Sequence, residues 1–498
     1  MNVFDLIAEQ ADRQPDHPAV IEDGAGARTV TYGELVANVR RRAAEFERAG
    51  IAPASRVGMI VPQGIEFIET ALAILAAGAC MVPIADDHPP ATVADIVRRA
   101  HLHALVEKPQ AGERRDPGDR KQVQVSAESD AWISPLASSR LAPISAEAPL
   151  EAGVERAFAA IGPAYLRFTS GTTSERKGVV IGHQHIVERL EAANRGLAIG
   201  PADRVLWLLP MAHHFVVSIL LYLRYGATIL LPANSLAPAI LGLAARERAT
   251  VLYASPHHMK LLAKDASGAR LDTLRLTIST AEGLRADVAT AFAARYGIAI
   301  VQALGIMEVG LPVMNTASAK TKPDVLGRPQ PAYEVWLRGD DGRPVTGNSA
   351  ENCGEICIRG PGMLDAYLDP WTPARSILEP DGFRTGDQGW FDSDGDLHLA
   401  GRRAARINMA GMKFFCEEVE AVLDTHPAIE RSRVSAKQHP HLGELPIAEI
   451  VLAPGATAPD PKELASFCRG RLASYMIPRS FEVVAELELT PTGKLARR

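Results

Sequence analysis

The stretch FTSGTTSERKGVV, residues 168–180, concentrates hydroxyl side chains, two glycines and a lysine between apolar flanks. Phosphate oxygens are bound where several donors converge. Hydroxyl groups and the backbone N–H groups of a glycine-permitted turn are such donors, and a lysine supplies compensating charge. The order differs from the GxxxxGK[ST] pattern, because Lys177 precedes Gly178 and no hydroxyl residue follows it. On residue chemistry alone, the stretch is either a phosphate-binding loop or a polar surface loop.

Further candidate residues follow three apolar segments that we expect to be strands. His213 and His214 come after RVLWLLP, Ala281 and Glu282 after LRLTIST, and Glu308 after AIVQALG. In open parallel sheets the carboxyl ends of the strands share one edge, so these side chains are expected to line one crevice. Taken singly, each has a simpler interpretation. The histidines can be polar residues at the end of a strand, and Glu308 can be a solvated carboxylate in a loop. Glu282 can lie at a helix N-terminus, where the helix dipole favours a negative charge.

The segments that must position these residues alternate between expected strands and helices, first over 56–107 and then over 204–306. This alternation predicts an α/β fold with two mainly parallel sheets flanked by helices. From about 327 to 360, short runs punctuated by Gly, Asp and Pro indicate antiparallel strands or a small β-barrel-like part. A different pattern begins near Arg402. We therefore expect a large N-terminal domain, 1–401, and a small α+β C-terminal domain, 402–498.

Composition excludes several classes of protein. The 498 residues carry a formal net charge of −6, which gives no support for nucleic-acid binding. The five cysteines are scattered and odd in number, which argues against a disulfide framework or a zinc site and fits a cytoplasmic protein. The N-terminus reads as an amphipathic helix rather than a signal peptide. The most apolar stretch, 205–232, is interrupted by His213, His214 and Arg224, so we expect no membrane span.

Beyond this point the stretch becomes part of a wider pattern. FTSGTTSERKGVV resembles the phosphate loop of the adenylate-forming superfamily, which includes acyl- and aryl-CoA synthetases, luciferases and the adenylation domains of peptide synthetases. Other segments match in the order of the family and extend the resemblance from about Thr29 to the C-terminus. They are TYGEL, LAAGACMVPI, LPMAHH, ISTAEGL, QALGIMEVG, GRPQPAYEV, GEICIRG, FRTGDQGWFDSDGDLHLAGR, GMKFFCEEVEAVL, SYMIPR and LTPTGK.

The resemblance implies roles for single residues on the nucleotide side. Glu308 matches the magnesium-binding glutamate, and Lys494 matches the lysine that contacts the carboxylate and the α-phosphate during adenylation. Asp387 and Arg402 match residues that hold the ribose hydroxyls, and Gly411 matches the glycine of the thiol channel. The residues expected to contact ATP are Thr169, Ser170, Gly171, Thr172, Thr173, Lys177, Ala281, Glu282, Asp387 and Arg402.

On the acid side, the resemblance implies that His213 lies where the carboxylate enters. The family usually has an aromatic residue and a threonine where this chain has Leu304 and Met307, so two contacts to the nucleotide are expected to be lost. Adenylation domains for α-amino acids carry an aspartate at the position of Val216, which predicts a substrate without an α-amino group. The residues expected to contact the acid are His213, His214, Val217, Ala281, Leu304, Gly305 and Met307.

The resemblance implies an AMP-forming acid–thiol ligase that uses ATP and Mg²⁺. The carboxylic acid, aryl or of short to medium chain length, is adenylated and then transferred to a thiol, expected to be coenzyme A. An acyl or aryl carrier protein, with its phosphopantetheine arm, is the alternative acceptor and an alternative partner. In the family, the small C-terminal domain is mobile between the two steps. The departures at Leu304 and Met307 leave another class open, a non-catalytic paralogue that binds nucleotide or acyl ligand.

Overall fold

The computed structural model describes residues 1–107, 140–144, 150–168, 177–345, 349, 352–378, 382–402, 405–409, 412–439, 443–469, 471–488 and 495. The chain divides into two compact units. The first comprises Met1–Thr169, Lys177–Glu334 and Arg359–Glu379. The second comprises, within the described ranges, Val335–Ile358 and Pro380–Arg498. The domain boundary at Arg402 stays a prediction.

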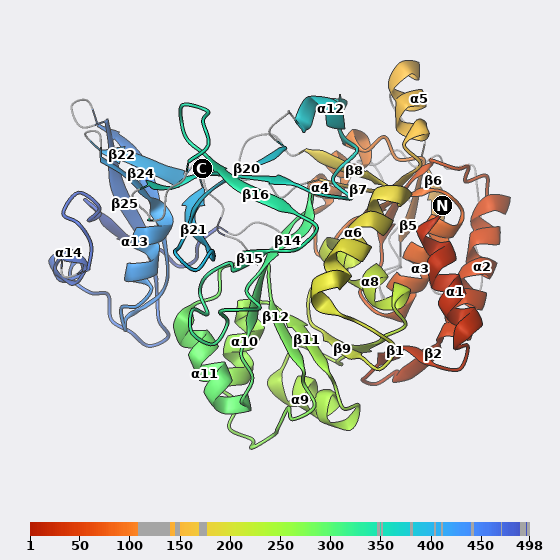
Figure 1. Ribbon diagram of the computed structural model, residues 1–498, viewed down its shortest axis with the longest axis horizontal. Coiled ribbons are helices and arrows are strands. Elements are labelled where there is room, and N and C mark those ends of the chain that lie inside the picture. The colour runs from red at the N-terminus through yellow and green to blue at the C-terminus, as the bar shows by residue number, and fades with distance from the viewer. Residues whose placement is uncertain are drawn as a thin grey trace. The chain divides into compact units, whose positions relative to one another are not determined.

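In the described part of the first unit, one sheet has nine strands, of which the central six run parallel as predicted (Figure 1). The parallel strands are β1 (Pro18–Glu22), β10 (Thr228–Leu231), β9 (Arg204–Trp207), β11 (Val251–Ala254), β12 (Leu276–Ser279) and β13 (Val301–Ile306). Antiparallel strands extend the two ends, namely β2 (Arg28–Thr31) beside β1, and β14 (Gly310–Met314) and β15 (Arg328–Pro329) beyond β13.

The second sheet of this unit is mixed rather than mainly parallel. Four of its eight described strands run parallel: β5 (Ala104–Glu107), β3 (Arg56–Ile60), β4 (Cys80–Pro83) and β7 (Pro163–Phe168). The antiparallel strands are β6 (Arg140–Pro143), β8 (Gly178–Gly182), β18 (Ala366–Leu368) and β19 (Thr372–Pro373). The prediction missed this half because a hairpin at β7–β8 and a late return of the chain at β18 carry no alternation of strand and helix.

The helices of the first unit cover the sheets with apolar faces. Leu206, Leu252 and Ala254 of the nine-stranded sheet belong to one core with residues of α9, α10 and α11. Of these helices, α10 and α11 lie side by side in Figure 1. The helices are α1 (Val3–Arg13), α2 (Tyr32–Arg48), α3 (Ile65–Ala76), α4 (Pro90–Arg99), α5 (Ala152–Ala160), α6 (His183–Leu197), α7 (Met211–His214), α8 (Ile219–Arg224), α9 (Ala237–Arg246), α10 (Pro256–Ala263), α11 (Ala286–Tyr296) and α12 (Ala374–Ile377), with a 3₁₀ turn at Phe215–Val217.

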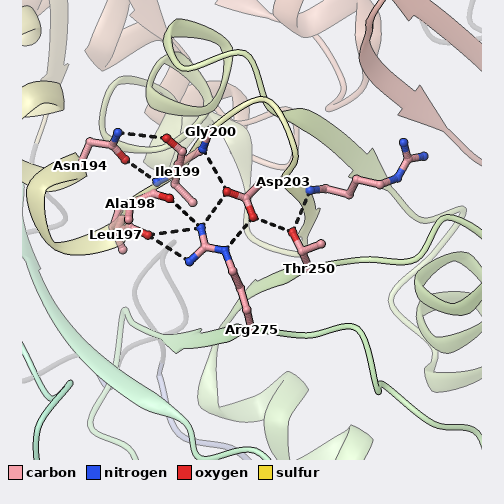
Figure 2. Close-up of polar contacts among 9 residues, drawn as sticks. Asn194, Leu197, Ala198, Ile199, Gly200, Asp203, Thr250 and Arg275 are labelled. Carbon is pink, nitrogen blue, oxygen red and sulfur yellow. Dashed lines mark hydrogen bonds and ion pairs between the residues drawn. The ribbon is translucent and has the colours of Figure 1, made fainter.

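An ion pair between the buried Asp203 and the exposed Arg275 fixes the amino-terminal edge of the nine-stranded sheet (Figure 2). Arg275 donates from Nε and Nη2 to the two carboxylate oxygens of Asp203, at 2.8 and 2.7 Å. Its Nη2 also donates to the carbonyl oxygen of Ala198, just after α6, at 2.9 Å. Thr250, one residue before β11, donates to Asp203 at 2.8 Å. Helix α6 is thereby tied to the start of β9 and β11, and the carboxyl edge of the sheet is left for other roles.

The second unit contains two described sheets. The sequence predicted either antiparallel strands or a small β-barrel-like part here. The structure has a four-stranded sheet of β16 (Glu334–Arg338), β17 (Gly354–Arg359), β20 (Phe383–Phe391) and β21 (Leu397–Arg402). The remaining elements form a second described sheet with two helices: β22 (Arg406–Met409), β23 (Met412–Phe415), α13 (Cys416–Leu423), β24 (Ile429–His439), β25 (Gly443–Leu452), α14 (Pro461–Arg469) and β26 (Phe481–Val483).

The N-terminal helix forms as predicted. Asn2 caps α1 by accepting a hydrogen bond from the N–H of Phe4 at 3.0 Å, and the side chain of Asp5 accepts one from Asn2 in return. Its apolar face, including Phe4 and Ile7, is buried. No helix within the described ranges has the length and apolar character needed to cross a bilayer.

Candidate active site

Glu308 stands in the tight turn that joins β13 to β14. Ile306 and Gly310 pair across this turn, and Gly310 has a φ of +115°, a conformation that favours glycine. The carbonyl oxygen of Glu308 accepts a hydrogen bond from the N–H of Leu364 at 2.8 Å. Its carboxylate accepts one from the hydroxyl of Tyr367 at 3.2 Å. Both backbone and side chain of Glu308 are therefore fixed by residues of the β18 segment.

Arg189 supports the same turn from beneath. Its side chain projects from α6 and is only 2% exposed. Nε donates to the carbonyl oxygen of Gly362 at 2.8 Å, and Nη1 donates to the carbonyl oxygen of Met307 at 3.0 Å. Burial lowers the pKa of Arg189, and the nearby Glu308 is among the groups that oppose this shift. One buried cation thus holds together the loop before β18 and the residue next to Glu308.

Burial and nearby positive charges act in opposite directions on the pKa of the Glu308 carboxylate. Burial raises its pKa above the ordinary value, while the hydrogen bond from Tyr367 and the charges of Lys177 and Arg189 lower it. The Nζ of Lys177 lies 4.9 Å from the centre of the Tyr367 ring, a cation–π distance. A half-buried carboxylate that is short of charge compensation is suited to bind a cation.

His213 and His214 are the last two residues of the short helix α7, the element that follows β9. The carbonyl oxygen of His213 accepts a hydrogen bond from Nη1 of Arg167, on β7, at 2.9 Å. Burial, helped by the charge of Arg167, lowers the pKa of His213 to about 2, so its ring is neutral at any ordinary pH. Its Nδ1 is buried and makes no hydrogen bond to a described residue. His213 therefore offers a neutral polar atom rather than a charge.

The loop after β12 has an unusual backbone. Ala281 has a φ of +78°, a left-handed conformation that residues with a Cβ atom rarely adopt. Its neighbour Thr280 donates from Oγ1 to the carbonyl oxygen of Ala303 on β13 at 2.9 Å, which joins this loop to the strand of Leu304 and Gly305. Helix α11 begins only at Ala286, so Glu282 lies in the loop and not at a helix N-terminus as the simpler interpretation had it.

The acid-side residues differ in their exposure. Leu304, Met307 and Val217 are half-buried and Gly305 is exposed, so each retains accessible surface that a ligand could contact. Val216, in contrast, is 3% exposed, and Phe215 is fully buried with its ring 5.8 Å from that of Phe67.

In the second unit, the two residues predicted to hold ribose stand opposite each other. Asp387 of β20 is the register partner of Arg402, the last residue of β21. The N–H of Asp387 donates to the hydroxyl of Thr385 at 3.0 Å, which shapes the strand at this point. The pairing brings together two candidates that lie 15 residues apart in the sequence.

Several predicted residues lie outside the described ranges. Strands β7 and β8 flank residues 169–177 and pair through Phe168 and Gly178, so these residues connect the two strands of a hairpin. The predictions for members of this segment, for the thiol channel and for the lysine near the end of the chain stay predictions. The residues concerned are Thr169, Ser170, Gly171, Thr172, Thr173, Gly411 and Lys494.

Sequence reasoning missed the residues that support Glu308. Tyr367 lies 59 residues from its partner, and no local pattern connects the two. Arg189 carried a weak signal, because it falls on the buried face of α6 with Ile186 and Leu190, where an unpaired cation would be costly. A charged residue on an apolar helix face is the feature that would have singled it out.

Comparisons with known proteins relate the chain to a family by its sequence and its fold. The family model described as AMP-binding enzyme matches residues 7–368, and the AMP-binding enzyme C-terminal domain matches residues 418–494. The sulfoacetate–CoA ligase of Cupriavidus necator is 28% identical over 99% of this chain and 97% of its own length. A feruloyl-CoA synthase of Amycolatopsis is 26% identical over 97% and 96%. The anthranilate–CoA ligase AuaEII, solved with anthranoyl-AMP, has a TM-score of 0.82 at 22% identity, covering 100% of this chain and 96% of its own, and supports the fold.

Proposed function

Because the chain belongs to the AMP-binding enzyme family and is an adenylating enzyme of the acyl- or aryl-CoA ligase type, we propose that it activates a carboxylic acid without an α-amino group and transfers it to coenzyme A. The observation that carries the proposal is the fixed position of Glu308. Tyr367 donates to its carboxylate, the N–H of Leu364 donates to its backbone carbonyl oxygen, and Arg189 holds the carbonyl oxygen of the preceding Met307. A carboxylate so constrained keeps one geometry through the reaction, which favours stabilisation of developing charge.

The residues around Glu308 fit a hard divalent cation. Mg²⁺ prefers oxygen ligands, and the Glu308 carboxylate is short of charge compensation. When bound to ATP phosphates, Mg²⁺ neutralises charge on their oxygens. The chain itself contributes position: Arg189 fixes the backbone next to Glu308, and Tyr367 orients the carboxylate. Lys177, exposed one residue before β8, offers a further positive charge for phosphate.

In the reaction, the carboxylate of the acid attacks the α-phosphorus of ATP, and pyrophosphate leaves. The thiol then attacks the acyl adenylate, the acyl–oxygen bond breaks, and AMP leaves. The neutral ring of His213 suits the neighbourhood of the reacting carboxylate, because it can hydrogen-bond without binding the acid as a permanent ion pair. The apolar residue at Val216 supports a substrate without an ammonium group, since no carboxylate is present there to pair with one.

The first test is pyrophosphate release over a panel of carboxylic acids, followed by mass spectrometry of the products with coenzyme A and with a phosphopantetheinylated carrier protein. We expect an acyl-CoA thioester. An acyl-carrier product alone would replace coenzyme A as the acceptor. Bound ATP without turnover of any acid would favour the non-catalytic paralogue, the alternative that the departures at Leu304 and Met307 keep open.

The second test removes the lysine that the family resemblance assigns to adenylation. Lys494→Ala is expected to lower pyrophosphate release by at least about 100-fold, because a charge that stabilises the transition state contributes several kcal/mol. Lys462→Ala, in the exposed first turn of α14, is the matched control and should retain activity. Equal rates for wild type and Lys494→Ala would refute the adenylation mechanism.

A further inference from the structure

Three strand termini lie side by side where the stretch proposed to bind phosphate meets the eight-stranded sheet. Phe168, the last residue of β7, and Leu368, the last residue of β18, are both register partners of Gly178, the first residue of β8. We call these three residues the strand-end row. Residues 169–177, the proposed phosphate loop, leave the sheet at Phe168 and return to it at Gly178. A rigid strand-end row would therefore fix both ends of this loop.

Gly178 leaves the middle of the strand-end row without a side chain. A Cβ atom placed there would lie 3.1 Å from Cε1 of Phe168 and 3.1 Å from the carbonyl oxygen of Leu368. The Phe168 ring thus occupies the space over Gly178. Phe168 and Leu368 belong to one buried core with residues of α4. The strand-end row is therefore packed against α4 through its two outer members.

Arg99, the last residue of α4, links the two outer ends of the strand-end row. Its guanidinium carbon lies 5.0 Å from the centre of the Phe168 ring, a cation–π distance. Its Nε pairs with the carboxylate of Asp369, the residue after Leu368, and its Nη2 donates to the carbonyl oxygen of Asp369 at 3.3 Å. The Arg99 side chain is only 16% exposed, so water screens these contacts only in part.

Arg99 lies on the face of the sheet opposite to Glu308. Successive side chains of a strand point to opposite faces, so Leu368 and Tyr367 point away from each other. Leu368 packs toward α4, whereas Tyr367 donates to the Glu308 carboxylate at 3.2 Å. A contact just beyond Leu368 therefore restrains the strand that orients Glu308, without a contact to Glu308 itself.

We propose that Arg99 is a positioning residue for ATP, because it ties the strand end where the phosphate loop begins to the strand that carries the partner of Glu308. The proposal rests on the proposed function, since it names what places the phosphate-binding residues of that site. Displacement of a binding group by about 1 Å can cost about 100-fold in rate. The acid-side residues His213 and Ala281 follow β9 and β12 of the other sheet, so they should keep their places when Arg99 is lost.

The test is Arg99→Met in the full chain, which keeps an unbranched apolar stem and removes the guanidinium. Titration calorimetry with ATP and Mg²⁺ should show a Kd about tenfold higher than that of the wild type. In pyrophosphate release with the most active acid of the panel, KM for ATP should rise and kcat should fall, while KM for the acid stays within about twofold. A residue that only stabilised the fold would lower the active fraction and leave both KM values unchanged.

Arg56 provides a matched control in the same sheet. It also lies 5.0 Å from the centre of a phenylalanine ring, that of Phe158, and its Nη1 pairs with the carboxylate of Glu155 at 2.9 Å. It is the first residue of β3, so it lies at the amino-terminal edge of the parallel strands, away from the phosphate loop. Glu155→Gln and Asp369→Asn each remove one carboxylate charge, from side chains that are 39% and 37% exposed. Only Asp369→Asn should raise the Kd for ATP.

Asp369→Asn also decides the question if Arg99→Met fails to fold, because asparagine tolerates the φ of +58° at this position. An unchanged Kd for ATP in Arg99→Met or in Asp369→Asn would overturn the inference, as would an equal rise in Glu155→Gln. The Kd is measured without an acid, so the two proposals can fail separately. A wild type that binds ATP and activates no acid rejects the proposed function alone, whereas a wild type that binds no ATP rejects both.

Discussion

At the scale of the residue, Glu308 shows how environment gives a common side chain a task. Its identity and place after a strand were predicted from the sequence, but its partners were not. The hydroxyl of Tyr367 orients it, and the N–H of Leu364 holds its backbone. Burial makes the charged form of the carboxylate costly and so raises its pKa. A carboxylate of this kind is a poor stabiliser of the fold, which fits the proposal that Glu308 binds a cation.

The variant Glu308→Gln tests this trade between activity and stability. Glutamine keeps the size and can still accept a hydrogen bond from Tyr367, but it carries no charge. We expect pyrophosphate release to fall by about 100-fold or more. The melting temperature should not fall, and at pH 7 it should rise, because the charged carboxylate no longer has to be buried. A raised folded pKa means that protonation stabilises the wild type, so the difference in stability should narrow as the pH falls.

Tyr296→Phe, which loses a buried hydroxyl on α11, serves as the stability control for Glu308→Gln. It should melt at a lower temperature than the wild type while retaining pyrophosphate release. A Glu308→Gln variant that lost activity and also melted well below the wild type would assign the loss to unfolding, and the role of Glu308 as a cation ligand would lose its support.

At the scale of the element, sequence periodicity predicted the strands whose neighbours in the chain are helices. The five strands β9 to β13 and the three strands β3 to β5 fall where alternation placed them. The antiparallel strands that extend these sheets could not be predicted from this alternation of strands and helices. β18 pairs with β8 although almost 190 residues separate Ala366 from Val180, and only tertiary packing selects that pairing. Tyr367 reaches Glu308 because β18 takes this place, so the orientation of the Glu308 carboxylate depends on a contact that no local pattern encodes.

Helix α6 contributes to the site through a single buried side chain, and Arg189→Met tests its importance. Methionine fills similar space but leaves the carbonyl oxygens of Met307 and Gly362 without their donor. We expect a loss of about 1–3 kcal/mol in the free energy of unfolding, since buried acceptors become unpaired. The turn of Glu308 would also shift, so kcat for pyrophosphate release should fall more than KM for ATP rises.

Arg195→Met is the control for this variant, because Arg195 lies on the exposed face of the same helix. It should change neither stability nor kcat by more than a small factor. If Arg189→Met lowered stability but left kcat untouched, Arg189 would be a structural cation only, and the link between α6 and the turn would carry no catalytic consequence.

At the scale of the whole molecule, titratable groups buried in the first unit set the response to acid. Burial lowers the pKa of His183 and His258 to about 4 and that of His213 to about 2. Burial alone would raise the pKa of Asp203, but hydrogen bonds from Arg275 and Thr250 outweigh it and lower the pKa overall. Two groups act in the other direction, because Asp365 raises the pKa of His185 and burial raises that of Glu308.

The lowered pKa values of the three histidines predict that the free energy of unfolding falls as the pH drops from 7 to 5. Each of the three buried histidines binds a proton in the unfolded chain below about pH 6.5 but stays neutral in the folded chain. The unfolded state then holds more protons, and by linkage stability decreases on acidification, by up to about 1.4 kcal/mol per pH unit for each histidine. Chemical denaturation at several pH values measures this slope. The double variant His183→Asn and His258→Asn, which leaves His213 in place, should flatten it, because asparagine does not titrate. A slope unchanged by the double variant would show that these two histidines do not set it, and the acid response between pH 7 and 5 would then be assigned to His213, whose pKa is also lowered.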